Sequence, residues 1–386
     1  MSVPFHERNL PTMQSAPDRI TVFDGREMIY FGGTGYLGLQ AAPEMIDAGC
    51  RGAREWGIAA ATSRARLGNN APTLAVERAA ADFFRTDDAF YLQSGFFGPA
   101  VIATACAAEF DTILIDEAAH YAVRDAAERA SAIGPSARRF AHCDVRAVED
   151  AVDESPKGHR FLVMSDGVFP AEGAIAPVVA YLDAVASRPG SAVFIDDAHG
   201  VGVLGSSGLG TREHHGLLGF PSNTTHEHPV RLFWTATLSK AFGGIGGVVA
   251  GESGFIDRLK STSRLYDGAS QPSSFDAGVS RHGIEIVQNR PELRSRLLTN
   301  VRLLRSRLRG IGIETGDSPV PIVAFRIGGR EQMTRIHAEL WEEGICLPYL
   351  SSYSGTDANG VLRATVFSTH TEADIERLTE VLSKKK

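Results

Sequence analysis

The sequence predicts an α/β fold: a mostly parallel central sheet with helices on both faces, followed by a small α+β C-terminal domain. From about Pro43 onwards, short apolar runs alternate with segments of helical periodicity, which is typical of a mostly parallel sheet. After the arginine-rich amphipathic segment Pro291–Leu308, strand-like and helix-like segments are mixed. A chain of 386 residues is also long enough for one large domain and a smaller one.

We expect three segments along the chain. Residues 1–42 form a polar N-terminal arm that contains Pro4, Pro11 and Pro17 and one short strand pair between Ile20 and Phe31. Residues 43–288 form the large domain and residues 289–386 the small domain. We find no internal repeat and no low-complexity linker.

The elements of the two domains follow from the apolar pattern. Helices of the large domain are expected at Glu44–Trp56, Thr73–Phe84 and Gly98–Ala108. Its strands are expected at Ala89–Leu92, Thr112–Ile115, Phe161–Ser165, Ala192–Ile195, Leu232–Thr235 and Gly247–Ala250. The small domain is expected to begin with the helix Pro291–Leu308 and to contain two further helices and strands at Val320–Arg326, Ile345–Leu347 and Leu362–Val366.

Composition excludes several classes of function. The net charge of -7 and the lack of a basic stripe argue against nucleic acid as a partner. The four cysteines lie far apart without metal-type or redox-type spacing, which predicts reduced thiols in a cytoplasmic protein. No run of 18 apolar residues and no basic segment before an apolar run is present, so we expect neither a membrane span nor a secretion signal.

Lys240 is the most informative single residue. Six lysines occur in the chain, and only Lys240 lies between two strand-like apolar runs, beside a glycine-rich turn. Burial of a charged amine is costly and lowers its pKa. A neutral amine can form a Schiff base, so this position suits a carbonyl cofactor such as pyridoxal phosphate (PLP). The alternative is a lysine at a strand end whose amine reaches water.

A candidate partner group precedes Lys240 in the chain. Ala192–Ile195 reads as a buried strand, and Asp196 follows at its carboxyl end, where open α/β sheets bind their ligands. A carboxylate there can pair with a pyridinium nitrogen and keep it protonated. His199 can hydrogen-bond the phenolic oxygen of the ring. Taken alone, the Asp-Asp-Ala-His sequence also fits a metal pair or a turn.

Seven motifs occur in a characteristic order. They are Tyr36–Leu39, Ser94–Phe97, Asp111–His120, Gly167–Phe169 with Ala176–Pro177, Asp196–Gly200, Thr237–Lys240, and Leu362–Arg363 with Thr369–His370. In this order and at this spacing the chain resembles the α-oxoamine synthase family of fold-type I PLP-dependent enzymes. The resemblance covers most of the chain and implies the fold-type I architecture.

The resemblance implies a role for each cofactor-side residue. Lys240 would hold PLP and then transfer protons, Asp196 would stabilise the pyridinium, His199 would bind the phenolic oxygen and His120 would stack on the ring. The turn at Ser94–Phe97 follows a strand and opens a helix, where backbone N–H groups suit a phosphate; a purely structural turn is the alternative. Further residues implied at the cofactor are Gly95, Phe96, Asp166, Thr237, Ser239 and, from the second subunit of a homodimer with shared active sites, Ser270.

The substrate side departs from the family pattern. Arg363 matches the arginine that grips the substrate α-carboxylate, a task that suits a forked guanidinium. The departures are Thr34, Thr73, Pro99, Asp166, Pro170 and the stretch Leu350–Ser354. Proline has no N–H and no side-chain donor, so Pro170 cannot replace the serine that donates to the cofactor. The resemblance therefore implies intact cofactor chemistry and altered pockets for the acyl donor and the amino acid.

The expected function is biosynthetic: decarboxylative condensation of a small amino acid with an acyl thioester, carried on coenzyme A or a carrier protein, to give an α-amino ketone. One alternative is aldol cleavage, transamination or decarboxylation on the same scaffold, and another is a non-catalytic PLP-fold subunit. No metal site is expected. Stretch 211–230 contains His214, His215, His226 and His228, which could bind a metal but read better as a solvated polar loop.

Overall fold

The computed structural model describes residues 10–225, 228–351 and 353–385. The chain divides into two compact units. The larger unit contains Pro43–Phe169 and Ile175–Asn289, and the smaller unit contains Met1–Ala42, Pro170–Ala174 and Arg290–Lys386. The sequence-based division into residues 1–42, 43–288 and 289–386 stays a prediction; in the compact units, the arm and the C-terminal segment belong together.

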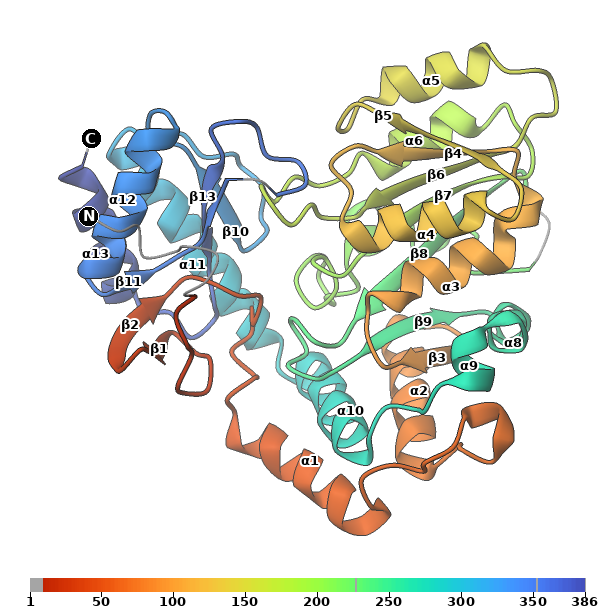
Figure 1. Cartoon of the computed structure of the whole chain (residues 1–386), viewed down its shortest axis with the longest axis horizontal. Coiled ribbons are helices and arrows are strands. Elements are labelled where there is room, and N and C mark those ends of the chain that lie inside the picture. Colours follow the sequence, from red (N-terminus) through yellow and green to blue (C-terminus); the bar gives the residue numbers. More distant parts are fainter. Residues whose placement is uncertain (1–9, 226–227, 352, 386) are drawn as a thin grey trace. The chain divides into compact units, whose positions relative to one another are not determined.

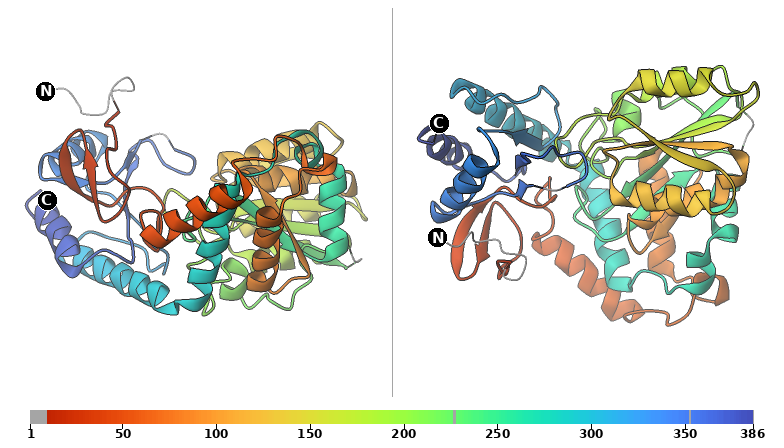
Figure 2. Two further views of the ribbon diagram at one scale, coloured as in Figure 1. Left: turned by 90° about the horizontal axis from the view of Figure 1, so that it is seen from below. Right: turned by 45° about the horizontal axis from the view of Figure 1, so that its top comes forward.

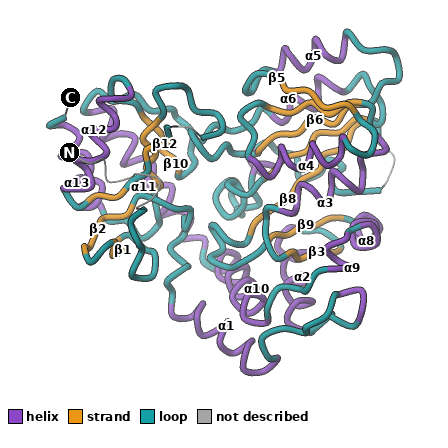
Figure 3. Tube along the Cα trace, in the orientation of Figure 1, coloured by secondary structure: helices purple, strands orange, loops and turns teal. Residues whose placement is uncertain are grey.

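The larger unit is built on a seven-stranded sheet with the strand order β3-β9-β8-β7-β6-β4-β5 (Figures 1 and 3). Its strands are β3 (Asp88–Leu92), β4 (Thr112–Asp116), β5 (Ser136–Phe140), β6 (Phe161–Asp166), β7 (Ser191–Asp196), β8 (Val230–Thr237) and β9 (Gly247–Gly251). Only β9 runs antiparallel to its neighbours, β3 and β8. The predicted α/β class with a mostly parallel sheet is confirmed.

Helices cover both faces of this sheet, because its strands are apolar on both sides. Those of the larger unit are α1 (Pro43–Trp56), α2 (Ala71–Phe84), α3 (Phe97–Cys106), α4 (Tyr121–Ser131), α5 (Val145–Asp153), α6 (Val178–Val185), α7 (Thr211–His214), α8 (Ser253–Thr262), α9 (Arg264–Gly268) and α10 (Ser274–Asn289). Helices α3, α4 and α8 share one apolar cluster with alternate strand residues such as Ile113 and Ile115. In Figure 1, α3 and α4 lie in front of the strands and α6 behind them. Helix α1 packs along α10 (Figure 2).

One strand and one helix of this unit show where the structure differs from the prediction. Strand β5 was not predicted from the sequence, because four of its five residues are exposed and it therefore lacks an apolar run. It is an edge strand, so one side of it pairs with no neighbour. The helix expected at Gly98–Ala108 begins at Phe97 and ends at Cys106, where a 3-10 turn, Ala107–Glu109, follows.

The smaller unit contains two three-stranded sheets and three long helices. One sheet combines β1 (Ile20–Phe23), β2 (Arg26–Tyr30) and β11 (Ile345–Cys346), and the other combines β10 (Ile322–Phe325), β13 (Val361–Thr365) and β12 (Tyr349–Leu350). The helices are α11 (Pro291–Gly310), α12 (Arg330–Glu342) and α13 (Glu372–Ser383).

The N-terminal arm is part of this unit because β11 pairs with β2 in parallel. An ion pair between Arg19 and Asp374, with 3.1 Å between nitrogen and oxygen, ties the arm to α13 as well. The predicted strand pair between Ile20 and Phe31 is present as β1 and β2, while Pro4 lies outside the described residues. Among the helices that the structure describes, none combines the length and the hydropathy needed to cross a lipid bilayer.

Candidate functional site

The predicted cofactor-side residues lie at one edge of the seven-stranded sheet. Strands β3, β4, β6, β7 and β8 run parallel to one another, so their carboxyl ends meet at the same edge. Just beyond or at these five ends lie, in the order of the chain, Gly95, His120, Asp166, Asp196 and Lys240. The sheet topology therefore brings together residues as far apart in the sequence as Gly95 and Lys240.

Two buried carboxyl groups lie side by side at the centre of this edge. Asp166 ends β6 and Asp196 ends β7, and the two are paired residues in the strand register. Their exposed fractions are 2% and 6%. Burial raises the pKa of both groups, and repulsion by Asp196 raises that of Asp166 further. A cation beside them would lower both pKa values and favour the carboxylates.

Lys240 provides one such cation. It lies in the turn after β8, and its charge lowers the pKa of Asp166 and of Asp196, although less than burial raises them. Lys240 is partly buried, and its neighbour Ser239 is exposed. The reason is that β8 ends at Thr237 and the following turn carries Lys240 beyond the apolar part of the strand.

His120 completes this group as a neutral imidazole. It caps α4, where its Nδ1 accepts a hydrogen bond from the Ala122 N–H at 3.2 Å, so the proton of the neutral ring sits on Nε2. Burial, and then the charge of Lys240, lower the pKa of His120 to about 4. The His120 backbone N–H donates to Asp166 Oδ2 at 2.7 Å. Its ring meets that of Phe96 edge-on, with 6.1 Å between centroids.

The turn before α3 packs tightly against the end of β8. A Cβ added to Gly95 would lie 2.8 Å from Thr237 Oγ1, so only glycine allows this close approach. The Thr237 hydroxyl donates to the Gly246 carbonyl at 3.0 Å, and Ser239 Oγ accepts from the Gly246 N–H at 3.0 Å. The two hydroxyls predicted for a phosphate thus lie close to Gly95 and to the start of a helix.

His199 and Ser270 occupy different surroundings. His199 is 5% exposed and follows β7 within the same edge. Ser270 is exposed, forms an isolated bridge with Ser63, and accepts a hydrogen bond at its carbonyl oxygen from the side chain of Gln93. Gln93 directly precedes the Ser94–Phe97 turn, so Ser270 lies near this turn of its own chain.

Thr235 was not predicted from the sequence. It is the residue of β8 paired with Asp196, and its side chain lowers the pKa of that carboxyl. Only the alignment of neighbouring strand ends could have pointed to it. Pyridoxal phosphate fits this set of residues: an amine, a buried carboxyl pair that gains from a cationic ring nitrogen, a neutral imidazole, and a glycine turn with two hydroxyls at a helix start.

Arg363 lies in the smaller unit, where backbone carbonyls hold it. It is 6% exposed on β13. Its Nε donates to the Pro170 carbonyl at 2.7 Å, and its Nη1 donates to the Gly33 carbonyl at 3.3 Å and to Thr365 Oγ1 at 2.8 Å. Pro170, which departs from the family pattern, therefore contributes through its backbone oxygen, a contact that any residue could make.

The other departures have local structural roles. The Thr34 carbonyl accepts from the Tyr36 N–H at 2.9 Å in the turn after β2. The buried Thr73 N–H is capped by the Asn70 side chain at 3.1 Å, while the Thr73 hydroxyl has no partner among the described residues. Pro99 lies in the first turn of α3, where helical N–H groups have no partner within the helix and proline is tolerated.

The histidines of stretch 211–230 do not form a metal-type cluster within the described residues: no such group includes His214, His215 or His228. His215 Nε2 lies 3.0 Å from the carbonyl oxygen of Ala176. His226 lies outside the described residues, as does Ser352 of the Leu350–Ser354 stretch.

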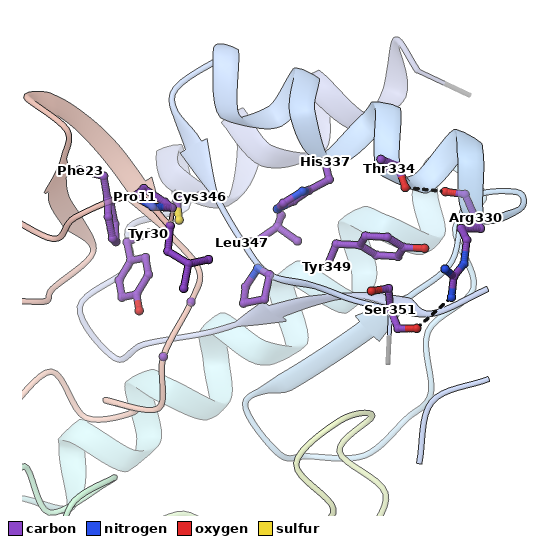
Figure 4. Close-up of a pocket in the computed structure, with 14 residues that line it drawn as sticks. Pro11, Phe23, Tyr30, Arg330, Thr334, His337, Cys346, Leu347, Tyr349 and Ser351 are labelled. Carbon is purple, nitrogen blue, oxygen red and sulfur yellow. Dashed lines mark hydrogen bonds between the residues drawn. The ribbon is translucent and has the colours of Figure 1, made fainter. Parts of the chain in front are cut away.

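The smaller unit also encloses a cavity of about 520 Å³ (Figure 4). Its wall includes Tyr30, His337, Leu347 and Tyr349, and also Gly33, whose carbonyl accepts from Arg363. Burial lowers the pKa of the His337 imidazole to about 4, so this ring is neutral at physiological pH. The lining suits an apolar group better than a charged one.

Comparison with known proteins gives a consistent result. Residues 27–382 match the family described as aminotransferase class I and II. The 8-amino-7-oxononanoate synthase of Methylococcus capsulatus is 33% identical over 96% of this chain and 92% of that protein. The 8-amino-7-oxononanoate synthase 1 of Polaromonas sp. is 32% identical over 94% of this chain and 87% of that protein.

Solved structures show the same fold. The serine palmitoyltransferase of S. paucimobilis, solved with bound PLP–myriocin, superposes with a TM-score of 0.88 at 23% identity, covering 97% of this chain and 92% of that one. The 8-amino-7-oxononanoate synthase of Francisella tularensis gives a TM-score of 0.76 at 22% identity, covering 92% of this chain and 97% of that one.

Proposed function

Because the chain belongs to the aminotransferase class I and II family, we propose that it is a PLP-dependent acyltransferase of the α-oxoamine synthase kind. It condenses an amino acid with an acyl thioester, with loss of carbon dioxide, to give an α-amino ketone. The observation that carries the proposal is the gathering of Lys240, Asp196, Asp166 and His120 at one sheet edge of a chain that is similar over nearly its whole length to 8-amino-7-oxononanoate synthases.

When bound, PLP supplies an electron sink for the pair of electrons left at the substrate α-carbon. The Lys240 amine would hold the cofactor and would move a proton at the α-carbon of the amino acid. Asp196 holds a proton on the ring nitrogen; its pKa is raised by burial in the free protein, so a cationic partner is favourable there.

The remaining side chains bind and orient. His120, neutral because its pKa is about 4, packs its flat ring against the cofactor without adding charge. His199 donates to the phenolic oxygen. Gly95 and Phe96 would seat the phosphate at the start of α3, close to the Thr237 and Ser239 hydroxyls, which form hydrogen bonds with Gly246.

Arg363 binds the α-carboxylate of the amino acid. A guanidinium has five N–H donors, and the contacts to Pro170, Gly33 and Thr365 use those on Nε and Nη1. These contacts, together with a side-chain hydrogen bond to Tyr36, fix the plane of the guanidinium. The burial of Arg363 strengthens such a charge-assisted bond.

The proposed assembly is a homodimer with shared active sites in the cytoplasm. Four large apolar side chains of the larger unit support it: Ile46, Trp56, Ile58 and Leu67 are 47%, 47%, 70% and 95% exposed. Leu67 also has a φ of +84°, which is uncommon for leucine. Light scattering tests this assembly, and Leu67→Asp should shift the protein towards the monomer.

The reaction is tested with PLP-loaded protein, each of the common amino acids and a series of acyl thioesters on coenzyme A or a carrier protein. Acyl transfer requires that thiol and carbon dioxide appear together, only when both substrates are present, with an α-amino ketone identified by mass spectrometry. Turnover of an amino acid without thioester would assign the alternative reactions. If no combination of substrates gives turnover, the remaining interpretation is a non-catalytic subunit. Lys240→Ala is the blank.

A further inference from the structure

A second group of reactive side chains lies at the same sheet edge but outside the proposed cofactor site. Asp116 ends β4, and His142 and Cys143 follow β5, the outermost strand. His142 Nδ1 lies 3.1 Å from Asp116 Oδ1, and His142 Nε2 lies 3.7 Å from Cys143 Sγ. A thiol, an imidazole and a carboxyl group are thus lined up in the order in which activated cysteines are arranged.

The carboxyl group of this cluster orients the imidazole. Asp116 is fully buried. Its Oδ1 accepts from the Ala118 N–H at 2.8 Å and from His142, and its Oδ2 accepts from the Cys143 N–H at 2.8 Å and the Tyr181 hydroxyl at 3.4 Å. These four donors occupy the acceptor positions of a carboxylate, so Asp116 serves better to hold His142 than to bind a metal ion.

His142 carries a positive charge in this setting. Burial alone would lower the pKa of its imidazole, but the hydrogen bonds to Asp116 and Cys143 outweigh burial and raise the pKa to about 10. Other titratable groups near the cluster are Glu117, which accepts from the His142 backbone N–H at 3.4 Å, Tyr181, and Asp166, whose pKa Asp116 raises. None of these adds a second positive charge that would compete with the imidazolium.

From this geometry we propose that Cys143, which lies beside the His142 imidazole that Asp116 holds, takes up small disulfides by thiol–disulfide exchange. The Cys143 sulfur attacks one sulfur of the disulfide, the S–S bond of the reagent breaks, and the other half leaves as a thiolate with the electron pair. A mixed disulfide with Cys143 forms, and no further oxidant is needed. This site does not depend on the proposed acyl transfer.

The other cysteines lack this arrangement. Burial raises the pKa of Cys106 and Cys346 to about 12, so both stay protonated. Cys50 is half-buried like Cys143 but lies within α1. Cys143 also adopts a φ of +55°, uncommon for cysteine, and its N–H bond to Asp116 holds it there.

The cluster is coupled to the proposed cofactor site by a short turn. The Ala119 N–H donates to the Asp116 carbonyl at 3.0 Å, and His120 follows directly. One short turn therefore joins Asp116 of the cluster to His120.

The test uses the full-length PLP-loaded protein and an aromatic disulfide whose released thiolate is coloured, with the modified cysteine identified by peptide mass spectrometry. At about pH 6.5 we expect Cys143 to react about tenfold or more faster than Cys50, its matched half-buried control. His142→Gln should slow Cys143 about tenfold at this pH and hardly at about pH 9.5, where thiols ionise without help. Cys143→Ser should abolish the fast release.

Three results would overturn the proposal. The first is equal reactivity of Cys143 and Cys50 in the unmodified sequence, a comparison that needs no variant to fold. The second is a His142→Gln variant, with an unchanged melting temperature, whose Cys143 reacts as fast as before at the lower pH. The third is that one equivalent of zinc stays bound after dialysis and prevents the labelling of Cys143 until a chelator is added. This result would identify the cluster as a metal site.

Discussion

The larger and the smaller unit hold their proposed functional residues in different ways. In the larger unit, the charge of Lys240 lowers the pKa of Asp166, Asp196 and His120, and Asp196 raises the pKa of Asp166. In the smaller unit, Arg363 is held mainly by the backbone carbonyls of Pro170 and Gly33. The proposed chemistry of the larger unit therefore depends on which side chains are present. The position of Arg363 in the smaller unit depends mainly on where the backbone runs.

This difference explains how Pro170 can depart from the family pattern and still contact Arg363. Replacing a residue leaves its carbonyl oxygen in place, so Pro170 keeps its contact with Arg363 although it has no donor. A substitution at Asp196 or Lys240 removes the functional group itself, and no backbone atom replaces it. The comparison predicts large effects for side-chain changes in the larger unit and smaller, graded effects in the smaller unit.

The largest effect is expected for Lys240→Ala. The protein as isolated should absorb at about 420 nm, as PLP bound to a lysine does, and borohydride should fix the cofactor on Lys240. The variant should lose both properties and all measurable activity. Lys260→Ala is the matched control: Lys260 pairs with Asp88 at 3.1 Å outside the site, and its loss should leave the colour unchanged. Labelling of a lysine other than Lys240 would contradict the assignment.

A slightly smaller effect is expected for Asp196→Asn. An amide cannot hold the pyridinium proton, so the interaction that strengthens as charge develops at the α-carbon is lost. We expect PLP to bind still, while kcat falls about a thousandfold, equivalent to about 4 kcal/mol, and KM for the amino acid changes little. Steady-state kinetics of the PLP-saturated variant measure this. Near-normal kcat would mean that another group protonates the ring.

Arg363→Lys should have a graded effect. An ammonium cannot reproduce the forked contact, and the loss of two charge-assisted hydrogen bonds corresponds to roughly 2–4 kcal/mol, or about 30- to 1,000-fold in affinity for the amino acid. The PLP spectrum without substrate should not change. Arg326→Lys, which alters an exposed ion pair with Glu172, is the control. If Arg363→Lys binds amino acids as tightly as the parent, the carboxylate is held elsewhere and the alternative reactions gain support.

The sequence was sufficient for the fold class and for residues at the ends of apolar strands, because a buried parallel strand leaves a clear apolar run. It was insufficient where the pattern is polar or short: β5 is an exposed edge strand, and β12 has only two residues. Strand β11 lies within the predicted Ile345–Leu347, but its pairing with β2, far away in the chain, was not predicted. Thr235 and the Asp116–His142 contact depend on which strands are neighbours. Sequence periodicity does not determine that order.

The smallest effect is expected when the pH is lowered, and it concerns the stability contributed by one histidine of the smaller unit. Burial lowers the pKa of His370 to about 4, although Asp374 and the Tyr30 carbonyl partly oppose it. Its Nδ1 accepts from the Phe367 N–H at 2.8 Å and its Nε2 lies 3.1 Å from the Tyr30 carbonyl oxygen, so the folded protein needs the neutral ring. The unfolded chain, with a His pKa of about 6.5, takes up the proton first as the pH falls.

The stability contributed by neutral His370 is therefore complete above about pH 6.5 and declines as the pH falls towards about 4. Between about pH 7 and pH 5 it should fall by about 2 kcal/mol. His370→Gln offers an acceptor and a donor that do not titrate, so its free energy of unfolding in urea should fall by about 2 kcal/mol less over the same interval. An equal fall in the parent and the variant would show that His370 is not kept neutral, and would place the acid sensitivity elsewhere, for example at His120 in the larger unit.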